Sequence, residues 1–160
     1  MLIKDTLNIS EVVWQNEIKG NFSKLTFVYK EQKYLIKCLY APNKDSVERD
    51  INNESSNFFR DLLDDKNDHD YHNCILAGDY NVALEYDKDT NGYINVNNPI
   101  SRRYIKTRMM MNNLVDVWRE RDPEKREYTF DRMQKKNRTG ARLDFFLLSR
   151  NSMDLVTGGA

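Results

Sequence analysis

Two apolar runs near the N-terminus have the partial alternation and the β-branched and aromatic content of β-strands. They cover residues 22–29 (FSKLTFVY) and residues 34–40 (YLIKCLY). The polar residues 31–33 between them predict a short turn, so the two runs form a predicted hairpin. Pro42 ends the second strand, because proline has no backbone N–H to give to a strand ladder.

After residue 46 the apolar side chains recur at helical spacing. Ser46 is a suitable N-cap, and the predicted helix ends in the acidic stretch 64–68. Its buried side is predicted to consist of Val47, Ile51, Phe58, Phe59, Leu62 and Leu63. Ser101 caps a second predicted helix, whose apolar stripe is formed by Tyr104, Met111 and Val115.

Short strands are predicted in the rest of the chain. Residues 1–5 and 74–77 each have strand character, and the second of these runs ends at Gly78 and Asp79. A long polar loop is predicted over residues 85–98. Two further strands, at 128–130 and 143–148, are joined by a basic hairpin loop over residues 132–140.

The order of these elements favours an α/β fold. Strands outnumber helices, yet helices separate them, which is typical of mixed sheets flanked by helices. The chain has 160 residues and shows no internal repeat and no low-complexity linker, so it is predicted to be one domain. No apolar run approaches the roughly 20 residues that a membrane-spanning helix needs, so no membrane association is expected.

The cysteines, the N-terminal residues and the distribution of charge each add a point. Cys38 and Cys74 each lie in an apolar run, which favours buried free thiols, with a disulfide as the alternative. Because residues 1–5 have no signal-peptide pattern, we expect an intracellular protein, nuclear or cytoplasmic. The net charge is zero, but residues 101–150 hold 14 Lys and Arg against 7 Asp and Glu. This basic segment indicates a surface for a polyanion, and a solvated helix face is the alternative.

Polar side chains that can act on a phosphate group stand at three predicted strand ends. Gly78-Asp79-Tyr80-Asn81 delivers a carboxylate and an amide to the tip of a strand, although the same residues are also typical of a turn. Tyr40 and Asn43 offer neutral hydrogen-bonding groups, or else a buried tyrosine and a turn asparagine. Asp144 lies in an apolar strand and needs a partner, either Arg142 or a catalytic histidine that it orients.

Four segments in this order resemble the endonuclease/exonuclease/phosphatase superfamily. They are LYAPN (39–43), ILAGDYNVALEYD (75–87), LVDVWRERDPEKREYTF (114–130) and RLDFFLLS (142–149). The stretch DVWR followed by YTF is most similar to the endonuclease domains of LINE-type (non-LTR) retrotransposons, and it is also similar to abasic-site repair endonucleases. The resemblance covers roughly residues 22–150, nearly the whole chain, and four motifs in register make it specific.

The resemblance implies a DNase I-like fold, which is a four-layer sandwich of two mixed sheets flanked by helices. It also implies DNA as the partner and Mg²⁺ as the cofactor. By position, Asp79 would orient or deprotonate the attacking water and Asn81 would hold the scissile phosphate. Tyr40 would contact that phosphate, Asn43 would support the pocket, and Asp144 would orient the catalytic histidine.

The family's asparagine and metal-binding glutamate belong upstream of this sequence, and its Ser-Asp-His motif belongs downstream. Residues 1–160 are therefore expected to be the central part of one domain, incomplete at both ends, and a poor nuclease on their own. No metal ligand is assigned. His69 and His72 form a single pair in a polar loop and are expected to face solvent.

Clustered cations favour nucleic acid over a small substrate, because several lysine and arginine side chains together can neutralise several backbone phosphates. The predicted DNA contacts are Arg132, Lys135, Lys136 and Arg138 in the hairpin loop, with Arg102 and Arg103 as helpers. Three alternatives remain open. One is a phosphatase of the same superfamily acting on a small phosphorylated substrate, another is a non-catalytic remnant that only binds nucleic acid, and the third is a merely solvated hairpin.

Overall fold

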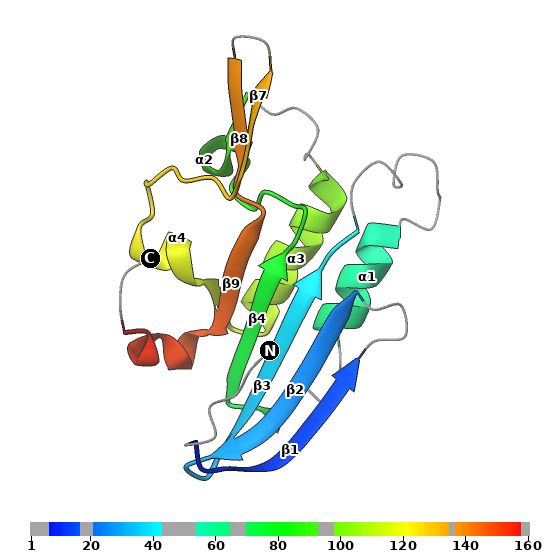
Figure 1. Cartoon of the computed structure of the whole chain (residues 1–160), viewed down its shortest axis with the longest axis vertical. Coiled ribbons are helices and arrows are strands. Elements are labelled where there is room, and N and C mark those ends of the chain that lie inside the picture. The colour runs from blue at the N-terminus through cyan, green and yellow to red at the C-terminus, as the bar shows by residue number, and fades with distance from the viewer. Residues whose placement is uncertain are drawn as a thin grey trace.

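The computed structural model describes residues 7–16, 21–42, 54–64, 70–92, 98–134 and 137–157. They form a six-stranded sheet in the order β1-β2-β3-β4-β9-β6 and a three-stranded sheet in the order β5-β8-β7. Figure 1 shows α1 and α3 on one face of the six-stranded sheet and the β7–β8 hairpin extending from one end of it. The mixed α/β fold with two sheets and flanking helices is thus confirmed.

The predicted N-terminal hairpin is confirmed. Strands β2 (Phe22–Tyr29) and β3 (Gln32–Tyr40) pair antiparallel over their full length. Lys30 and Glu31 both have positive φ angles, 48° and 64°, as the tightest hairpin turns require, so the turn is one residue earlier than predicted. Strand β1 (Ile9–Asn16) adds to β2 and was not predicted, whereas the strand predicted at residues 1–5 lies outside the described residues.

The centre of the large sheet joins segments far apart in sequence. Strand β4 (Asn73–Asp79) runs parallel to β3, and β9 (Asp144–Ser149) runs antiparallel to β4. Strand β6 (Leu114–Asp116) pairs with the second half of β9 only. The crossover between β3 and β4 contains α1 (Glu54–Leu63), as a parallel pair requires.

Helix α1 buries the four apolar residues predicted for its described part, Phe58, Phe59, Leu62 and Leu63. Its predicted start, with Ser46, Val47 and Ile51, lies outside the described residues. Lys37 of β3 is 1% exposed, and its Nζ donates to the Leu62 carbonyl at 2.6 Å, which satisfies an orphan carbonyl of the last helical turn.

Helix α3 (Pro99–Met111) starts earlier than predicted. The N-cap is Asn98, whose side chain accepts from the backbone N–H of Ser101 at 3.1 Å, so the prediction that Ser101 is the cap was wrong. Of the predicted apolar stripe, Tyr104 packs against the core, but Met111 is 65% exposed and Val115 belongs to β6, so those two assignments were wrong. Ile105 of α3 is fully buried in the core, and Met109 packs against the same cluster.

The residues predicted as loops contain short regular elements. Helix α2 (Tyr86–Asp89) and strand β5 (Thr90–Asn91) lie in the predicted polar loop, and α4 (Val117–Arg121) follows β6. The predicted basic loop is mostly a hairpin of β7 (Phe130–Gln134) and β8 (Asn137–Ala141). A 3-10 helix, η3 (Arg150–Leu155), follows β9.

The core lies between the large sheet and α1 and α3. Its centre is the stacked pair of Tyr80 and Phe145, whose ring centroids are 3.8 Å apart, with Phe59 beyond Tyr80. Both cysteines are free, as expected, but Cys38 is exposed and Cys74 half-buried, so the expected burial of Cys38 was wrong. Among the described residues, no helix combines the length and apolarity needed to cross a bilayer.

Candidate functional site

Three of the predicted site residues form one row across the large sheet. Tyr40 of β3 is in register with Asp79 of β4, and Asp79 is in register with Asp144 of β9. Residues paired across neighbouring strands point to the same face of a sheet, so the three side chains share one face at one end of their strands. Tyr40 is 62% exposed, Asp144 is exposed and Asp79 is half-buried.

Gly78 allows this row to form. Its φ is +142°, and a Cβ atom at this position would lie 1.9 Å from the backbone oxygen of Leu39. Only glycine permits β3 and β4 to approach so closely just before Asp79. The two chains stay together beyond it, because the N–H of Ala41 donates to the carbonyl of Asp79 at 2.8 Å.

Asn81 is held in a turn that faces the same end of the sheet. Its φ is +50°, so the residues after Asp79 form the turn that their composition also indicated. The backbone N–H of Asn81 donates to Oδ1 of Asp79 at 2.8 Å, and its Nδ2 donates to the carbonyl of Ala41 at 2.7 Å. The turn at residues 79–81 is therefore part of the site, because the Asn81 N–H holds the Asp79 carboxylate in position.

Asp144 differs from its prediction. Asp144 is exposed rather than buried. Arg142 pairs with Asp89 and Asp116, so the predicted alternative of an ion pair between Asp144 and Arg142 was wrong. Burial raises the pKa of the Asp79 carboxyl above its ordinary value, and the neighbouring negative charge of Asp144 raises it further. The Asn81 backbone hydrogen bond lowers the pKa of Asp79, but it does not cancel the rise.

Sequence reasoning missed a buried network of four charges behind this row. Arg142, 3% exposed, donates from Nε to Asp89 at 2.8 Å and from Nη2 to Asp116 at 2.6 Å. Arg119 adds a contact to Asp89 at 2.5 Å. Burial alone would raise the pKa of Asp89, but the hydrogen bonds and charge of Arg142 bring it below its ordinary value. Three of the four charged residues stand in the DVWR and RLD motifs, but the sequence does not indicate which of them form ion pairs.

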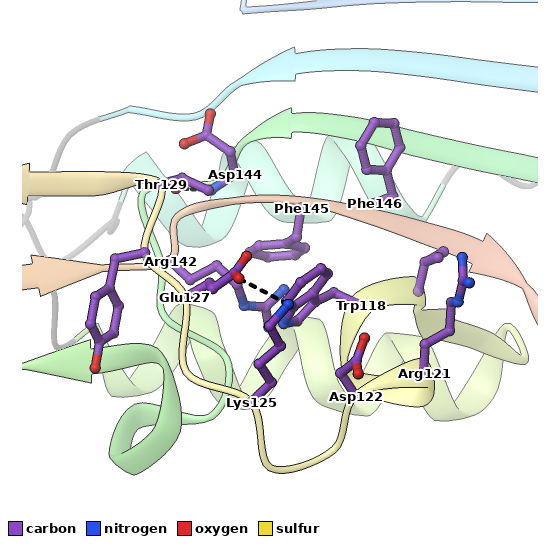
Figure 2. Close-up of a pocket in the computed structure, with 12 residues that line it drawn as sticks. Trp118, Arg121, Asp122, Lys125, Glu127, Thr129, Arg142, Asp144, Phe145 and Phe146 are labelled. Carbon is purple, nitrogen blue, oxygen red and sulfur yellow. Dashed lines mark hydrogen bonds and ion pairs between the residues drawn. The ribbon is translucent and has the colours of Figure 1, made fainter. Parts of the chain in front are cut away.

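A cavity of about 370 Å³ opens beside Asp144. Figure 2 shows Trp118 and Phe145 in its wall, with Thr129 and Asp144 together at one side. Nζ of Lys125 lies 4.6 Å from the centre of the Trp118 ring and 2.9 Å from the Glu127 carboxylate. Four of the twelve residues that line the cavity are aromatic, and the Lys125 ammonium is held over the indole of Trp118.

The predicted DNA-contacting cations have different surroundings. Arg132 on β7 and Arg103 on α3 are exposed. Arg138 on β8 forms an ion pair with Asp131 through both Nε and Nη2, and the Arg102 guanidinium lies 5.5 Å from the centre of the Tyr86 ring. Lys135 and Lys136, like Asn43 and His69, lie outside the described residues. His72 is exposed, as predicted.

The described residues do not make a complete magnesium site. No group of three His, Cys, Asp or Glu side chains comes together among them, and the row contributes two carboxylates only. Mg²⁺ usually takes one or two carboxylates together with water and substrate phosphate, in octahedral geometry.

Comparison with known proteins gives matches of structure only. No protein-family model matches the sequence, and no curated protein is similar to it. A 3′-5′ exonuclease (NExo) from Neisseria meningitidis matches with a TM-score of 0.68 and 16% identity, over 94% of this chain and 62% of the exonuclease. The endonuclease domain of TRAS1, a telomere-specific non-LTR retrotransposon, matches with a TM-score of 0.58 and 14% identity, over 92% of this chain and 60% of that domain. The AP endonuclease LMAP from Leishmania major matches with a TM-score of 0.61 and 20% identity, over 84% of this chain and 47% of that enzyme.

The chain therefore spans between about half and three fifths of the solved structures that it matches. Those structures include abasic-site endonucleases, an exonuclease and a retrotransposon endonuclease domain, the classes that the four sequence motifs resemble. At these low identities the match concerns the fold. The chain shares the DNase I-like fold of these solved structures.

Proposed function

We propose that the intact domain is an endonuclease that hydrolyses phosphodiester bonds and nicks DNA, as the target-site nickase of a retrotransposon polyprotein. The observation that carries the proposal is the row of Tyr40, Asp79 and Asp144, with Asn81 bound to Asp79. We further propose that residues 1–160 are the central part of that domain. The partial coverage of the structural neighbours, 62% of the exonuclease, supports this second proposal.

Asp79 is suited to the role of general base. A carboxylate whose pKa is raised by burial and by a neighbouring carboxylate accepts a proton more readily near neutral pH. The water proton passes to Asp79 as the water oxygen bonds to phosphorus. The bond from phosphorus to the leaving oxygen then breaks, and that oxygen takes up a proton. The Tyr40 phenol and the second N–H of Asn81 Nδ2 are suited to hold the phosphate oxygens.

A Mg²⁺ requirement is part of the proposal, on the strength of the family resemblance. The ion stabilises negative charge on the phosphate and the leaving oxygen in such reactions. Because no group of three His, Cys, Asp or Glu side chains is gathered among the described residues, we propose that the acidic ligand of the ion comes from elsewhere in the intact domain. The family's catalytic histidine, which Asp144 would orient, has to come from there too.

DNA as the substrate has two supports. A structure of Neisseria NExo, described as a 3′ phosphatase, is bound to a product DNA hairpin. In this chain, β8 ends at Ala141, immediately before Arg142 and three residues before Asp144, so the base of the β7–β8 hairpin lies beside the row. We propose that Arg132, Lys135 and Lys136 lie against the DNA backbone, with Arg102 and Arg103 as helpers. Arg138 is expected to contribute less than the others, because Asp131 already neutralises it.

The test is nicking of supercoiled plasmid with and without Mg²⁺. The 160-residue chain is compared with the same chain extended by the glutamate-bearing and histidine-bearing segments of its own reading frame. We expect the chain alone to be slower by about 10²- to 10⁴-fold, because a missing general acid–base or charge-stabilising group costs this much. Asp79→Ala should abolish nicking by the extended protein.

Asp61→Ala is the matched control, because Asp61 is an exposed carboxylate on α1. If Asp79→Ala nicks as fast as the parent, the proposed site is wrong. Brisk nicking by the 160-residue chain, abolished by Asp79→Ala, would show that the outer segments are dispensable. Release of phosphate from a 3′-phosphorylated oligonucleotide without nicking would favour the phosphatase alternative, and binding without either reaction would favour a non-catalytic remnant.

The proposed DNA contacts predict a change in salt dependence. Each phosphate contact that is lost should reduce the slope of log affinity against log salt by about 0.9, so Lys135→Ala with Lys136→Ala should reduce it by about 1.8. The loss should be independent of DNA sequence, because phosphates carry no base information. Lys33→Ala, at the far end of β3 from Tyr40, is the control. An unchanged slope in the double variant would leave the hairpin as a solvated element.

A further inference from the structure

Two segments of the family-like pattern are not used by the proposed chemistry. They are residues 114–130 and the arginine at 142. Both converge on the start of β9, the strand that begins with Asp144. Their contacts explain how an exposed carboxylate at a strand end keeps a fixed position.

Thr129 takes the place of a missing strand neighbour. Strand β6 pairs with β9 only at residues 147–149, so on that side Asp144 has no strand partner among the described elements. The Oγ1 atom of Thr129 accepts the backbone N–H of Leu143 at 3.0 Å and that of Asp144 at 3.1 Å. Figure 2 shows Thr129 beside Asp144. One hydroxyl therefore fixes two consecutive backbone amides at the start of the strand.

Arg142 fixes the chain two residues before Asp144. Its backbone N–H donates to the carbonyl of Asp89 at 2.8 Å, and its guanidinium donates to the carboxylates of Asp89 and Asp116. A planar guanidinium held between two carboxylates permits little rotation of its own chain segment. The Leu143 carbonyl then accepts the N–H of Tyr80 at 2.8 Å, which ties the same segment to β4.

We propose that Thr129 and Arg142 are positioning residues that hold the Asp144 carboxylate opposite Asp79. This inference rests on the proposed function of the row. The consequence is electrostatic. Asp79 has Tyr40 on its β3 side and Asp144 on its β9 side, so Asp144 is the charged group that faces it from a neighbouring strand. A displaced Asp144 acts on Asp79 less strongly, because the interaction of two charges falls with distance.

The test follows the carboxyl carbon of Asp79 by NMR during a pH titration of the 160-residue chain. Asp144→Asn sets the reference, because it removes the negative charge and should lower the pKa of Asp79. Thr129→Val keeps the shape of the side chain but removes the acceptor. The midpoint of Asp79 in this variant should fall between those of the parent and Asp144→Asn. Thr129→Ser keeps the hydroxyl and should titrate like the parent.

Thr129 and Asp144 are exposed, so the Asp144 amide released by Thr129→Val can bond to water and the variant should remain folded. Arg142→Lys, which cannot grip both carboxylates, should lower the midpoint of Asp79 further if it folds. Thr107→Val is the matched control, because the Thr107 hydroxyl donates to the Arg103 carbonyl of its own helix, α3.

A folded Thr129→Val protein in which Asp79 titrates as in the parent would overturn the inference. The measurement needs no nuclease activity, so its outcome is separate from that of the proposed function. A lowered midpoint in a protein whose extended form does not nick DNA would support the positioning role and reject the function. An unchanged midpoint in a protein whose extended form nicks DNA would reject the positioning role and support the function.

Discussion

Two pairs of aspartates lie close together in this fold and have opposite surroundings. Asp79 and Asp144 face each other across β4 and β9 at the edge of the sheet, and no arginine or lysine pairs with either among the described residues. Asp89 and Asp116 are buried behind them and share the guanidinium of Arg142. The pKa of Asp79 is raised, by burial first and then by Asp144, and that of Asp89 is lowered by its arginine partners.

The difference separates a carboxylate that supports the fold from one that is available for chemistry. A paired, buried carboxylate is stabilised in its charged form and has no acceptor capacity to spare. An unpaired carboxylate beside a like charge is held in an unfavourable state, which the rest of the fold maintains. Like charges placed together without a cation are typical of functional sites, and Asp79 has this arrangement.

Breaking the buried network should have the largest effect on stability. Arg142→Met leaves Asp89 and Asp116 buried with one fewer cation, and removing one partner of a buried pair commonly costs about 3–5 kcal/mol. Urea unfolding of the 160-residue chain measures the loss. Arg150→Met is the control, because the Arg150–Glu120 pair is about half exposed on both sides and should contribute less than about 1 kcal/mol. Equal small losses for both variants would contradict a structural role of the network.

The loss of folding stability at low pH should depend on the same network. Because the pKa of Asp89 is lower in the folded state than its ordinary value of 3.8, its contribution to stability is present above that value. The contribution is lost as the pH falls through the lower, folded-state pKa. Asp89→Asn should therefore be less stable at pH 7 and lose less additional stability below pH 4 (about the ordinary Asp value). Melting temperatures across pH measure this. Parallel curves for the parent and Asp89→Asn would show that Asp89 does not contribute to the acid sensitivity.

The sequence pattern predicted those elements whose residues lie close together along the chain. The hairpin of residues 22–40 follows from strand-forming residues with partial alternation, and the strand ending at Asp79 follows from a short apolar run. Tyr40, Asp79 and Asp144 were identified because each stands at or near a strand end. The buried network could not be predicted, because Arg142 finds its partners 53 and 26 residues away in sequence.

The exposure of Asp144 was mispredicted for a related reason. Phe145 and Leu147 are 4% and 0% exposed, whereas Phe146 is 59% exposed. Residues 144 and 146 thus share the open face of β9, and an apolar run concealed this alternation. In the same way, Val115 continues the helical spacing of α3 in the sequence but belongs to a strand.

Neutralising Asp79 should have the smallest effect on stability, with the opposite sign. Its pKa is raised in the folded state, so its ionised form is disfavoured there and stability falls as the pH rises above its ordinary value. Asp79→Asn removes that charge and keeps an oxygen to accept the Asn81 N–H. Since Asp79 is only half-buried, solvent screening limits the gain at pH 7 to the order of 0.5 kcal/mol.

The decisive measurement is the plasmid-nicking rate of Asp79→Asn in the extended protein, with urea unfolding of the same preparation. If Asp79 is the general base, nicking should fall by at least about 10²-fold while the free energy of unfolding stays equal to that of the parent or rises slightly. If nicking persists, or if it is lost only together with several kcal/mol of stability, Asp79 is a structural carboxylate like Asp89, and the site proposed at this edge is wrong.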